Sequence, residues 1–323
     1  MPIQNYPTVF DCTEMTAAVN KLPARPFFFK PLFEVKGVKT TTVSLDIRQG
    51  RIVLIGDSER NTAPESLAGR GAKREWKHLS CAHLAQSDTL APEDLQDVRA
   101  FGSTEPISVA AVYNDKMQQL KDNLAATMEF HRLGAIKGVV LDADGTTVLH
   151  DIFNTFGATK KTLDISFPKT AADDANPILT SILKAKRHVE AAMGGTPFDH
   201  IECIIGSDAY DMLTSHKLVR EYFERWLSNR ENFGNNDYRK RGFPYGGLTF
   251  VERSDVVGGQ TMVAAKKGHV YPVGPGIFKQ YHAPADWMET VNTIGLEYYA
   301  RMDEKPKGRG FDLEVQSNPL TLC

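Results

Sequence analysis

Two aspartates in residues 139–148 are the side chains of this sequence whose type and spacing best suit chemistry. Asp142 and Asp144 follow the apolar run 139–141 and precede Gly145. Two carboxylates placed one residue apart at the end of a strand can supply a nucleophile and an acid/base group, and together they can hold Mg²⁺. This stretch therefore has to be weighed as a catalytic site.

The same stretch resembles the first motif of haloacid dehalogenase-type phosphatases, in which the first aspartate is the nucleophile and the second the acid/base. That chemistry also needs a later Ser or Thr at a strand end, a lysine and an acidic pair. Ser207 matches in part, and no acidic pair is convincing. A β-hairpin explains the residues better, because Asp-Gly between two apolar runs is a strong hairpin signal. We predict a hairpin over 139–149 with Asp142 and Asp144 as turn residues, and the phosphatase is the alternative.

Three further residues, His78, Cys81 and His83, have side chains of the types that bind zinc. Zinc normally needs three or four ligands, so a site here would need a second cluster of ligands elsewhere in the chain. The other three cysteines stand in unrelated contexts. We therefore predict no catalytic residue, no metal and no cofactor. The four cysteines lie far apart, so we also predict that their thiols stay reduced.

The composition is that of an ordinary globular protein and argues against two classes of partner. Hydrophobic residues make up 41% and charged residues 24%, with a net charge of −2. A general nucleic-acid binder would carry a clear basic excess. No apolar run approaches the ~18 residues of a membrane span, so no membrane partner is expected. A length of 323 residues allows roughly two domains.

The elements that position these residues begin with an irregular N-terminal segment. Residues 1–35 contain five prolines, which break any long helix. Phe27, Phe28 and Phe29 lie between two of these prolines. Three consecutive aromatic side chains must be covered, and the sequence leaves open whether their own domain or a neighbouring subunit covers them.

A long polar excursion follows this segment. Residues 38–45 and 51–56 have strand character, and 46–50 is predicted to be the turn between them. Strands return near 76–84, and residues 46–78 carry a small basic excess with few apolar anchors. Because such an excursion is uncommon inside a compact domain, we predict either a disordered loop or an arm that reaches a partner.

The strongest helical pattern covers residues 104–136. Apolar side chains recur there at steps of three and four: Ala110, Tyr113, Met117, Leu120, Leu124 and Met128. The opposite face is predicted to be polar, with Asp115, Lys116, Lys121, Asp122 and Glu129. Residues 88–129 carry a clear acidic excess, so an acidic helical region follows the basic excursion.

The second half of the sequence has the pattern of an α/β region. Asn176 and Pro177 are typical of a helix start, and Gly194 is typical of its end. A strand over 200–205 leads to a second helix capped by Ser207-Asp208, with a break near 215–216. Further strands are predicted over 248–252, 260–265 and 311–316.

Taken in this order, the elements resemble a tailed-phage major capsid protein, specifically the lambda-type major capsid protein E family. The most specific stretches are YHAPAD (281–286), ETVNT (289–293) and EVQSNPL (314–320), and GSDAY (206–210) is also similar. The resemblance covers essentially the whole chain. It implies an α+β fold of the Hong Kong 97 type, with an N-arm, an extended β-loop, a long spine helix, a peripheral domain and an axial domain.

The resemblance also implies domain limits. It places the N-terminal arm at 1–37, the extended loop at 38–85, the peripheral domain at 86–175 and 301–323, and the axial domain at 176–300. The spine helix is the helix at 104–136.

The function implied is that of a subunit that self-assembles, through hexamers and pentamers, into the icosahedral head shell, without catalysis. Its location would be the virion, after assembly in the host cytoplasm. The implied partners are other copies of the chain, a separate scaffold protein, a portal, a possible decoration protein and double-stranded DNA packaged without sequence specificity. A non-viral encapsulating shell protein of the same fold is a further alternative.

Candidate contacts between subunits follow from the charge pattern. A net charge near zero limits repulsion between copies, and the basic excursion can face acidic surfaces of a neighbour. The basic candidates are Arg70, Lys73 and Arg74, and the acidic candidates are Glu93, Asp94 and Asp97. Phe27, Phe28 and Phe29 complete the set of predicted contact residues.

Overall fold

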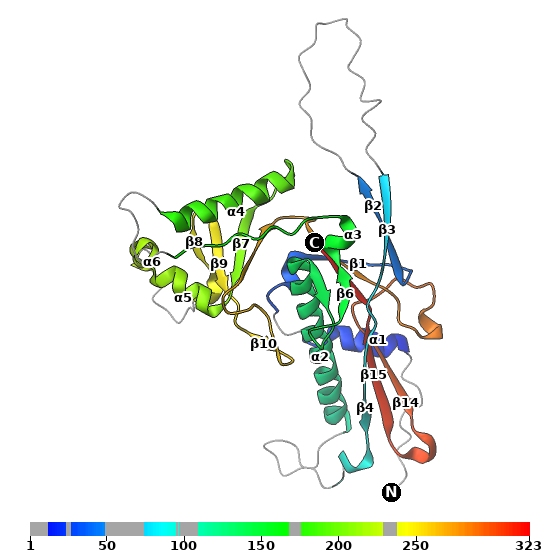
Figure 1. The fold of residues 1–323 in the computed structure, drawn as a ribbon. Coiled ribbons are helices and arrows are strands. Elements are labelled where there is room, and N and C mark those ends of the chain that lie inside the picture. The colour runs from blue at the N-terminus through cyan, green and yellow to red at the C-terminus, as the bar shows by residue number, and fades with distance from the viewer. Residues whose placement is uncertain are drawn as a thin grey trace, which may run out of the picture. The chain divides into compact units, whose positions relative to one another are not determined.

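The structure of the chain is a computed structural model that describes residues 12–23, 27–48, 74–94, 96, 109–167, 176–228 and 238–323. The chain divides into two compact units (Figure 1). The first unit contains Met1–Val43, Leu79–Asp151 and Phe278–Cys323, and the second contains Ser44–His78 and Ile152–Ile277. The stretch 278–300, which we expected with the axial domain, therefore packs with the first unit.

The first unit is built along one helix, α2 (Val109–Lys137), of 29 residues. It packs against a sheet of order β14 (Tyr299–Glu304), β15 (Phe311–Ser317) and β4 (Leu84–Leu90), whose neighbours are all antiparallel (Figure 1). Helix α1 (Cys12–Lys21) packs on β14. The predicted long helix is thus confirmed over 109–136 and continues one residue further, and its first predicted residues lie outside the described part of the chain.

A second sheet of the first unit joins distant parts of the sequence. Its order is β1 (Phe33–Gly37), β13 (Phe278–His282) and β16 (Pro319–Leu322). β1 runs parallel to β13, and β16 runs antiparallel to it. After α2 comes the antiparallel pair β5 (Val139–Leu141) and β6 (Val148–Asp151), which confirms the hairpin predicted at 139–149. Short 3₁₀ turns complete the unit: Lys30–Leu32, Pro92–Asp94, Met288–Thr290 and Pro306–Gly308.

The apolar stripe of α2 forms the core of this unit. Met117, Leu120, Leu124 and Met128 are buried against α1 and against β14 and β15. The predicted polar face is wrong in part, because Lys121 and Glu129 are also buried. Their burial has a physical cause: the N-terminal segment, through Val19 O and Phe29 N, covers the side of α2 that the sequence pattern left for solvent.

The second unit has a four-stranded sheet of order β12 (Gly268–Val273), β7 (His200–Ile205), β9 (Leu248–Glu252) and β8 (Phe243–Tyr245). β7 and β9 are parallel, and the other neighbours are antiparallel. The helices are α3 (Ile152–Phe156), α4 (Pro177–Met193), α5 (Ser207–Ser215), α6 (Lys217–Ser228) and α7 (Tyr238–Arg241). Among the described residues, no helix is both long and apolar enough to cross a bilayer.

Local sequence signals set several boundaries in this unit. Asn176 caps α4, since its Oδ1 accepts a hydrogen bond from Leu179 N at 3.0 Å, and Gly194 ends the helix in the left-handed region with φ 58°. α5 begins one residue earlier than predicted, with Gly206 at its N-cap. A Cβ on Gly206 would lie 2.2 Å from Ala264 O, so only glycine fits there. The break before α6 is confirmed at His216.

Two predicted strands differ from the structure. The strand at 260–265 is limited to β11 (Gln260–Thr261), which pairs with β10 (Val256–Val257). The turn predicted at 46–50 is wrong over 46–48, because β2 (Thr42–Arg48) continues through these residues and pairs with β3 (Arg74–Ser80). The alternation of β-formers in the sequence continues to residue 47. Residues 49–73 lie outside the described part of the chain.

Candidate functional site

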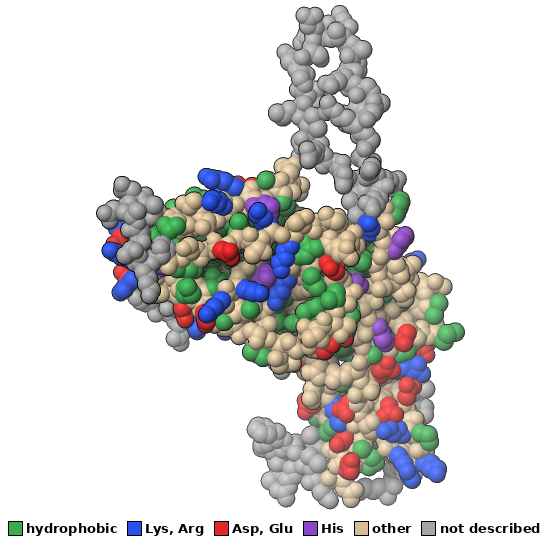
Figure 2. Space-filling view, in the orientation of Figure 1, with side chains coloured by type: hydrophobic (Ala, Val, Ile, Leu, Met, Phe, Trp, Pro, Cys, Tyr) green, Lys and Arg blue, Asp and Glu red, His purple; other side chains and the backbone are tan. Residues whose placement is uncertain are grey.

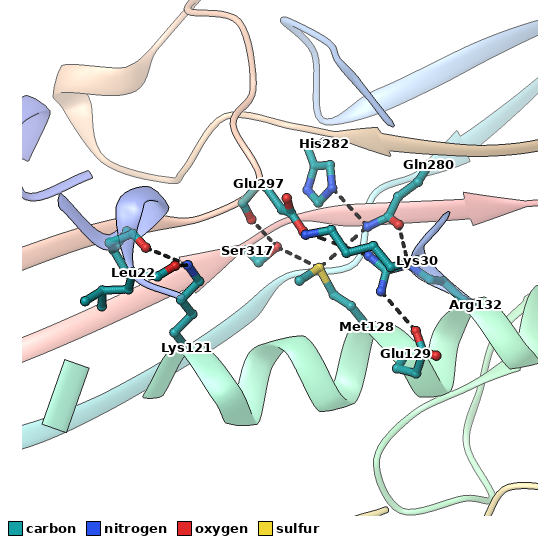
Figure 3. Close-up of polar contacts among 11 residues, drawn as sticks. Leu22, Lys30, Lys121, Met128, Glu129, Arg132, Gln280, His282, Glu297 and Ser317 are labelled. Atoms are coloured by element: carbon teal, nitrogen blue, oxygen red, sulfur yellow. Dashed lines mark hydrogen bonds and ion pairs between the residues drawn. The ribbon is translucent and has the colours of Figure 1, made fainter. Parts of the chain in front are cut away.

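Charged and polar side chains meet inside the first unit, where segments far apart in the sequence converge (Figure 3). We call this set the polar junction. Its members come from the N-terminal segment, from α2, from β13 and from the loop before β14: Lys30, Glu129, Arg132, Gln280, His282 and Glu297.

Glu129 and Arg132 form the centre of the polar junction. They lie one helical turn apart on α2, and Glu129 Oε2 is 3.2 Å from Arg132 Nη1. The other carboxylate oxygen accepts a hydrogen bond of 2.7 Å from Phe29 N. Arg132 Nε donates to Gln280 Oε1 at 2.8 Å. These contacts fix the N-terminal segment and β13 to the same turn of α2.

A second ion pair completes the balance of charge. Lys30 Nζ is 2.7 Å from Glu297 Oε1, and Arg132 Nη2 is 3.9 Å from the same oxygen. Two cations thus face two anions. The pairing matters most for the buried Glu129 and Arg132, because an unpaired charge is strongly disfavoured away from water. The junction is therefore neutral as a whole.

His282 is neutral at pH 7. Gln280 uses its Oε1 for Arg132, so its Nε2 donates to His282 Nε2 at 2.9 Å. Burial lowers the pKa of His282 to about 4. The sulfur of Met128 lies close to the same group: Gln280 Nε2 is 3.6 Å from Met128 Sδ, and Ser317 Oγ is 3.4 Å from it. The arrangement links strands and helix without placing a nucleophile beside a base.

Lys121 ties α1 to α2 in a similar way. Its Nζ donates to Val19 O at 2.8 Å and to Leu22 O at 2.7 Å, at the end of α1 (Figure 3). The ammonium also lies 5.1 Å from the centroid of the Tyr298 ring. Burial lowers the pKa of Lys121. A cation at the C-terminus of a helix satisfies carbonyls that have no partner within the helix.

The aspartates of the β5–β6 hairpin make the hydrogen bonds of a turn. Asp144 accepts from Thr146 N and Thr147 N, both at 2.8 Å, and from Thr147 Oγ1 at 2.6 Å. The Thr147 hydroxyl and these amides hold the pKa of Asp144 well below its usual range. Asp142 closes the turn through its amide, which donates to Thr147 O at 2.8 Å.

The three residues with zinc-binding side chains have other partners. The His78 ring lies 2.8 Å from Ser44 Oγ, and His83 Nδ1 lies 2.8 Å from Asn318 Oδ1. Burial raises the pKa of the Cys81 thiol to about 11. Within the part of the chain that the structure describes, no group of three His, Cys, Asp or Glu side chains could hold a metal ion.

The predicted contact residues occupy different surroundings. Phe29 is buried in its own unit, Phe27 packs partly against the core of that unit, and Phe28 meets the Phe29 ring edge-on at 5.0 Å. Asp94 Oδ2 accepts from Ala91 N at 2.9 Å. Arg70, Lys73 and Asp97 lie outside the described residues, as does the side chain of Arg74.

The predicted acidic contact residues lie just after β4, near two salt bridges made by Lys116. Lys116 Nζ lies 3.0 Å from Asp88 Oδ2 and 3.3 Å from Asp94 Oδ2. Glu93 is exposed. Asp94 therefore already has a cation of its own chain, whereas the Glu93 side chain faces solvent.

Two stretches that carried the resemblance lie side by side. β13 pairs with β16, so that His282 faces Pro319. Asn318 Nδ2 donates to Pro284 O at 2.8 Å, and Gln316 Nε2 donates to Asp286 Oδ1 at 2.8 Å. Both stretches carry the family resemblance, but nothing in their residues predicts that they lie beside the polar junction.

Comparison with known proteins gives one consistent result. The family described as Phage major capsid protein E matches residues 11–323. The chain is 26% identical over 344 residues to the major capsid protein of Pseudomonas phage KPP10, covering 99% of this chain and 96% of that protein. It is 24% identical to the major capsid protein of Salmonella phage Felix O1, covering 97% and 93%.

The fold has a match among solved structures. The capsid of Ralstonia phage GP4 aligns with a TM-score of 0.51 at 12% identity, covering 93% of this chain and 88% of that chain. At this identity, the match speaks for the fold, which agrees with the Hong Kong 97 type expected from the order of elements.

Proposed function

The chain belongs to the phage major capsid protein E family, and we propose that its copies join in hexamers and pentamers to form the shell. It is the major capsid protein of a tailed phage, forms the head shell and is not an enzyme. The match over residues 11–323 carries this conclusion. Membership of this family rules out the alternative of a phosphatase built on Asp142 and Asp144. Both named relatives are phage proteins, which favours a phage capsid over a non-viral shell protein.

We infer the roles of the parts from their construction. α2 with the β14–β15–β4 sheet is the spine and peripheral domain, and the second unit, with its own apolar core, contains the axial domain. β2 and β3 form the base of the extended loop. The polar junction supports this proposal, because it fixes the end of the N-terminal arm to the spine helix.

The proposed partners follow from the role of a shell. A separate scaffold protein, a portal and a decoration protein would meet the assembled shell, which forms in the host cytoplasm and becomes the virion. DNA would be enclosed without sequence specificity, and the net charge of −2 supports this, since the chain has no basic excess for tight binding.

We also propose that the basic excursion of one copy meets acidic surfaces of the next. The basic side chains are Arg70, Lys73 and Arg74, and the acidic ones are Glu93, Asp94 and Asp97. Exposure of Glu93 supports this pairing, whereas Asp94 contributes less because Lys116 already neutralises it. Phe27 and Phe28 keep some accessible surface for a neighbour, and Phe29 does not.

Imaging of the purified protein tests the proposal directly. Sedimentation followed by negative-stain microscopy should show closed particles with hexameric and pentameric capsomers. Reversing the charge of Arg70, Lys73 and Arg74 together should reduce assembly, and reversing Glu93, Asp94 and Asp97 as well should restore it. Normal assembly of the first variant, or no rescue by the second, would refute the proposed pairing without affecting the shell function.

A further inference from the structure

An apolar surface is displayed on the loop that joins β13 to β14. We call residues 288–296 the apolar loop. Its aliphatic side chains are strongly exposed: Met288 is 89% exposed, Ile294 59%, Val291 56% and Leu296 46%. In Figure 2, hydrophobic side chains reach the surface over the loop that Figure 1 draws in orange.

Hydrogen bonds within the apolar loop and to its two flanks hold it in one shape. Thr290 Oγ1 donates to Ala285 O at 2.7 Å, and Thr293 Oγ1 donates to Thr290 O at 2.7 Å. Leu296 N donates to the Tyr299 hydroxyl at 2.9 Å. The aliphatic side chains are therefore presented by an ordered backbone, which lowers the entropy cost of binding a partner.

Close packing against β1 fixes the loop further. Gly295 N donates to Val38 O at 2.9 Å. A Cβ on Gly37 would lie 2.2 Å from Gly295 O, and a Cβ on Gly295 would lie 1.9 Å from His282 O. Only glycine fits at both positions. β1, in the same unit, also exposes Val35.

We propose that the apolar loop is a docking surface for a second copy of this chain. Contiguous exposed apolar side chains mark interaction sites on soluble proteins. The loop offers four exposed aliphatic residues, whereas a stable pairwise interface uses about 20–30 residues on each side. It is too small to hold a dimer in solution, but it suits a weak contact repeated by every subunit of a closed shell. The net charge of −2 allows copies to approach.

Oxidation of the native protein tests this inference, which rests on shell formation. Met288 in dissociated subunits should react rapidly with hydrogen peroxide and should be protected in particles made of this chain alone. Mass spectrometry of the tryptic peptides measures both rates, with the exposed Met212 of the second unit as a reference. Particles in which Met288 stays as reactive as in subunits overturn the inference. Protection that appears only when another phage protein or lipid vesicles are added overturns it as well, and absence of particles would instead refute the proposed function.

A matched pair of variants gives a second measurement. Val291→Asp with Ile294→Asp should raise the subunit concentration needed for assembly about tenfold, equivalent to ~1.4 kcal/mol. Val148→Asp with Val256→Asp changes two valines that are 54% and 62% exposed elsewhere and should assemble as the parent does. Both variants should keep the unfolding midpoint of the parent. Assembly of the first pair at the parental concentration contradicts the proposal.

Discussion

The interiors of the two units differ in kind. The first unit buries the ion pair Glu129–Arg132, and the partly exposed pair Lys30–Glu297 completes the polar junction, which joins segments from residues 29 to 297. The second unit has an aromatic core around Phe243, whose ring lies 5.0 Å from Phe223 and 5.5 Å from Trp226 by centroid. The first unit collects three separate parts of the chain, whereas the helices and sheet of the second come from one stretch, Ile152–Ile277. Directional bonds fix distant segments in register, a task that packing alone performs less well.

The largest expected effect is the loss of Arg132. Arg132→Ala leaves Glu129 buried without its cation, which should lower the free energy of unfolding of the first unit by about 3–5 kcal/mol. Urea unfolding, followed by the fluorescence of Trp287 in a variant with the other two tryptophans replaced, measures the effect. The control is Arg220→Ala, because Arg220 pairs with Glu224 at 2.7 Å on the exposed surface. An equal effect of both changes would contradict the role given to burial.

Phe243→Ala is the corresponding change in the second unit. Removing this buried ring should cost about 3–5 kcal/mol, because it leaves a cavity among four aromatic neighbours. These neighbours are Tyr222, Phe223, Trp226 and Tyr245. Trp226 fluorescence should report the loss, and Trp287 fluorescence should keep the parental midpoint. A shift at Trp287 as large as that at Trp226 would mean that the two units do not unfold separately.

Acid should weaken the first unit more than the second. Burial lowers the pKa of both His282 and His131 to about 4 from a usual value of 6.5. The unfolded chain therefore takes up protons at a higher pH than the folded chain, and stability declines as the pH falls from about 6.5 toward 4. The loss approaches about 3 kcal/mol for each histidine.

Charged neighbours enter this pH dependence from every side. His282 faces Glu297, Arg132 and Lys30, and His131 faces Asp142, His150 and Arg132. Urea midpoints at pH 7.5, 6 and 5 measure the trend, and His282→Gln should remove part of it. Equal acid sensitivity of the parent and this variant would show that His282 is not responsible.

Local signals made the second unit the easier one to predict. The cap at Asn176 and the stop at Gly194 act through neighbouring backbone groups, so the sequence alone identifies α4. The limits of β7 and β9 also agree with the prediction. For the cap, Asn176→Ala should cost about 1 kcal/mol, measured by the same Trp226 unfolding curve. Asn176→Ser, which keeps an acceptor, should restore most of the stability.

The polar junction could not be predicted because its partners are remote in sequence. Arg132 and Gln280 are 148 residues apart, and no local rule pairs them. Helical periodicity predicts a solvent-exposed face for Glu129 and Lys121. Periodicity shows which residues lie on the same face of a helix, but it does not show which other segment packs against that face. The stretches around His282 and Ser317 carry the family resemblance, but their contact with α2 depends on the tertiary fold.

The smallest expected effect on stability comes from removing the charge of Asp144, which lies on the surface of the first unit. Asp144→Asn keeps a side-chain oxygen that can accept from Thr146 N and Thr147 N, and it gives up the negative charge and an acceptor for Thr147 Oγ1. Because water solvates the exposed hairpin, the unfolding midpoint and the assembly of shells should change little. Asp142→Asn should likewise leave assembly intact, and both variants can be compared with Arg132→Ala in the same Trp287 assay. A loss as large as that of Arg132→Ala would mean that charge itself, and not its burial, distinguishes the two units. Assembly lost in either hairpin variant while the midpoint is unchanged would instead place these aspartates at a contact between copies.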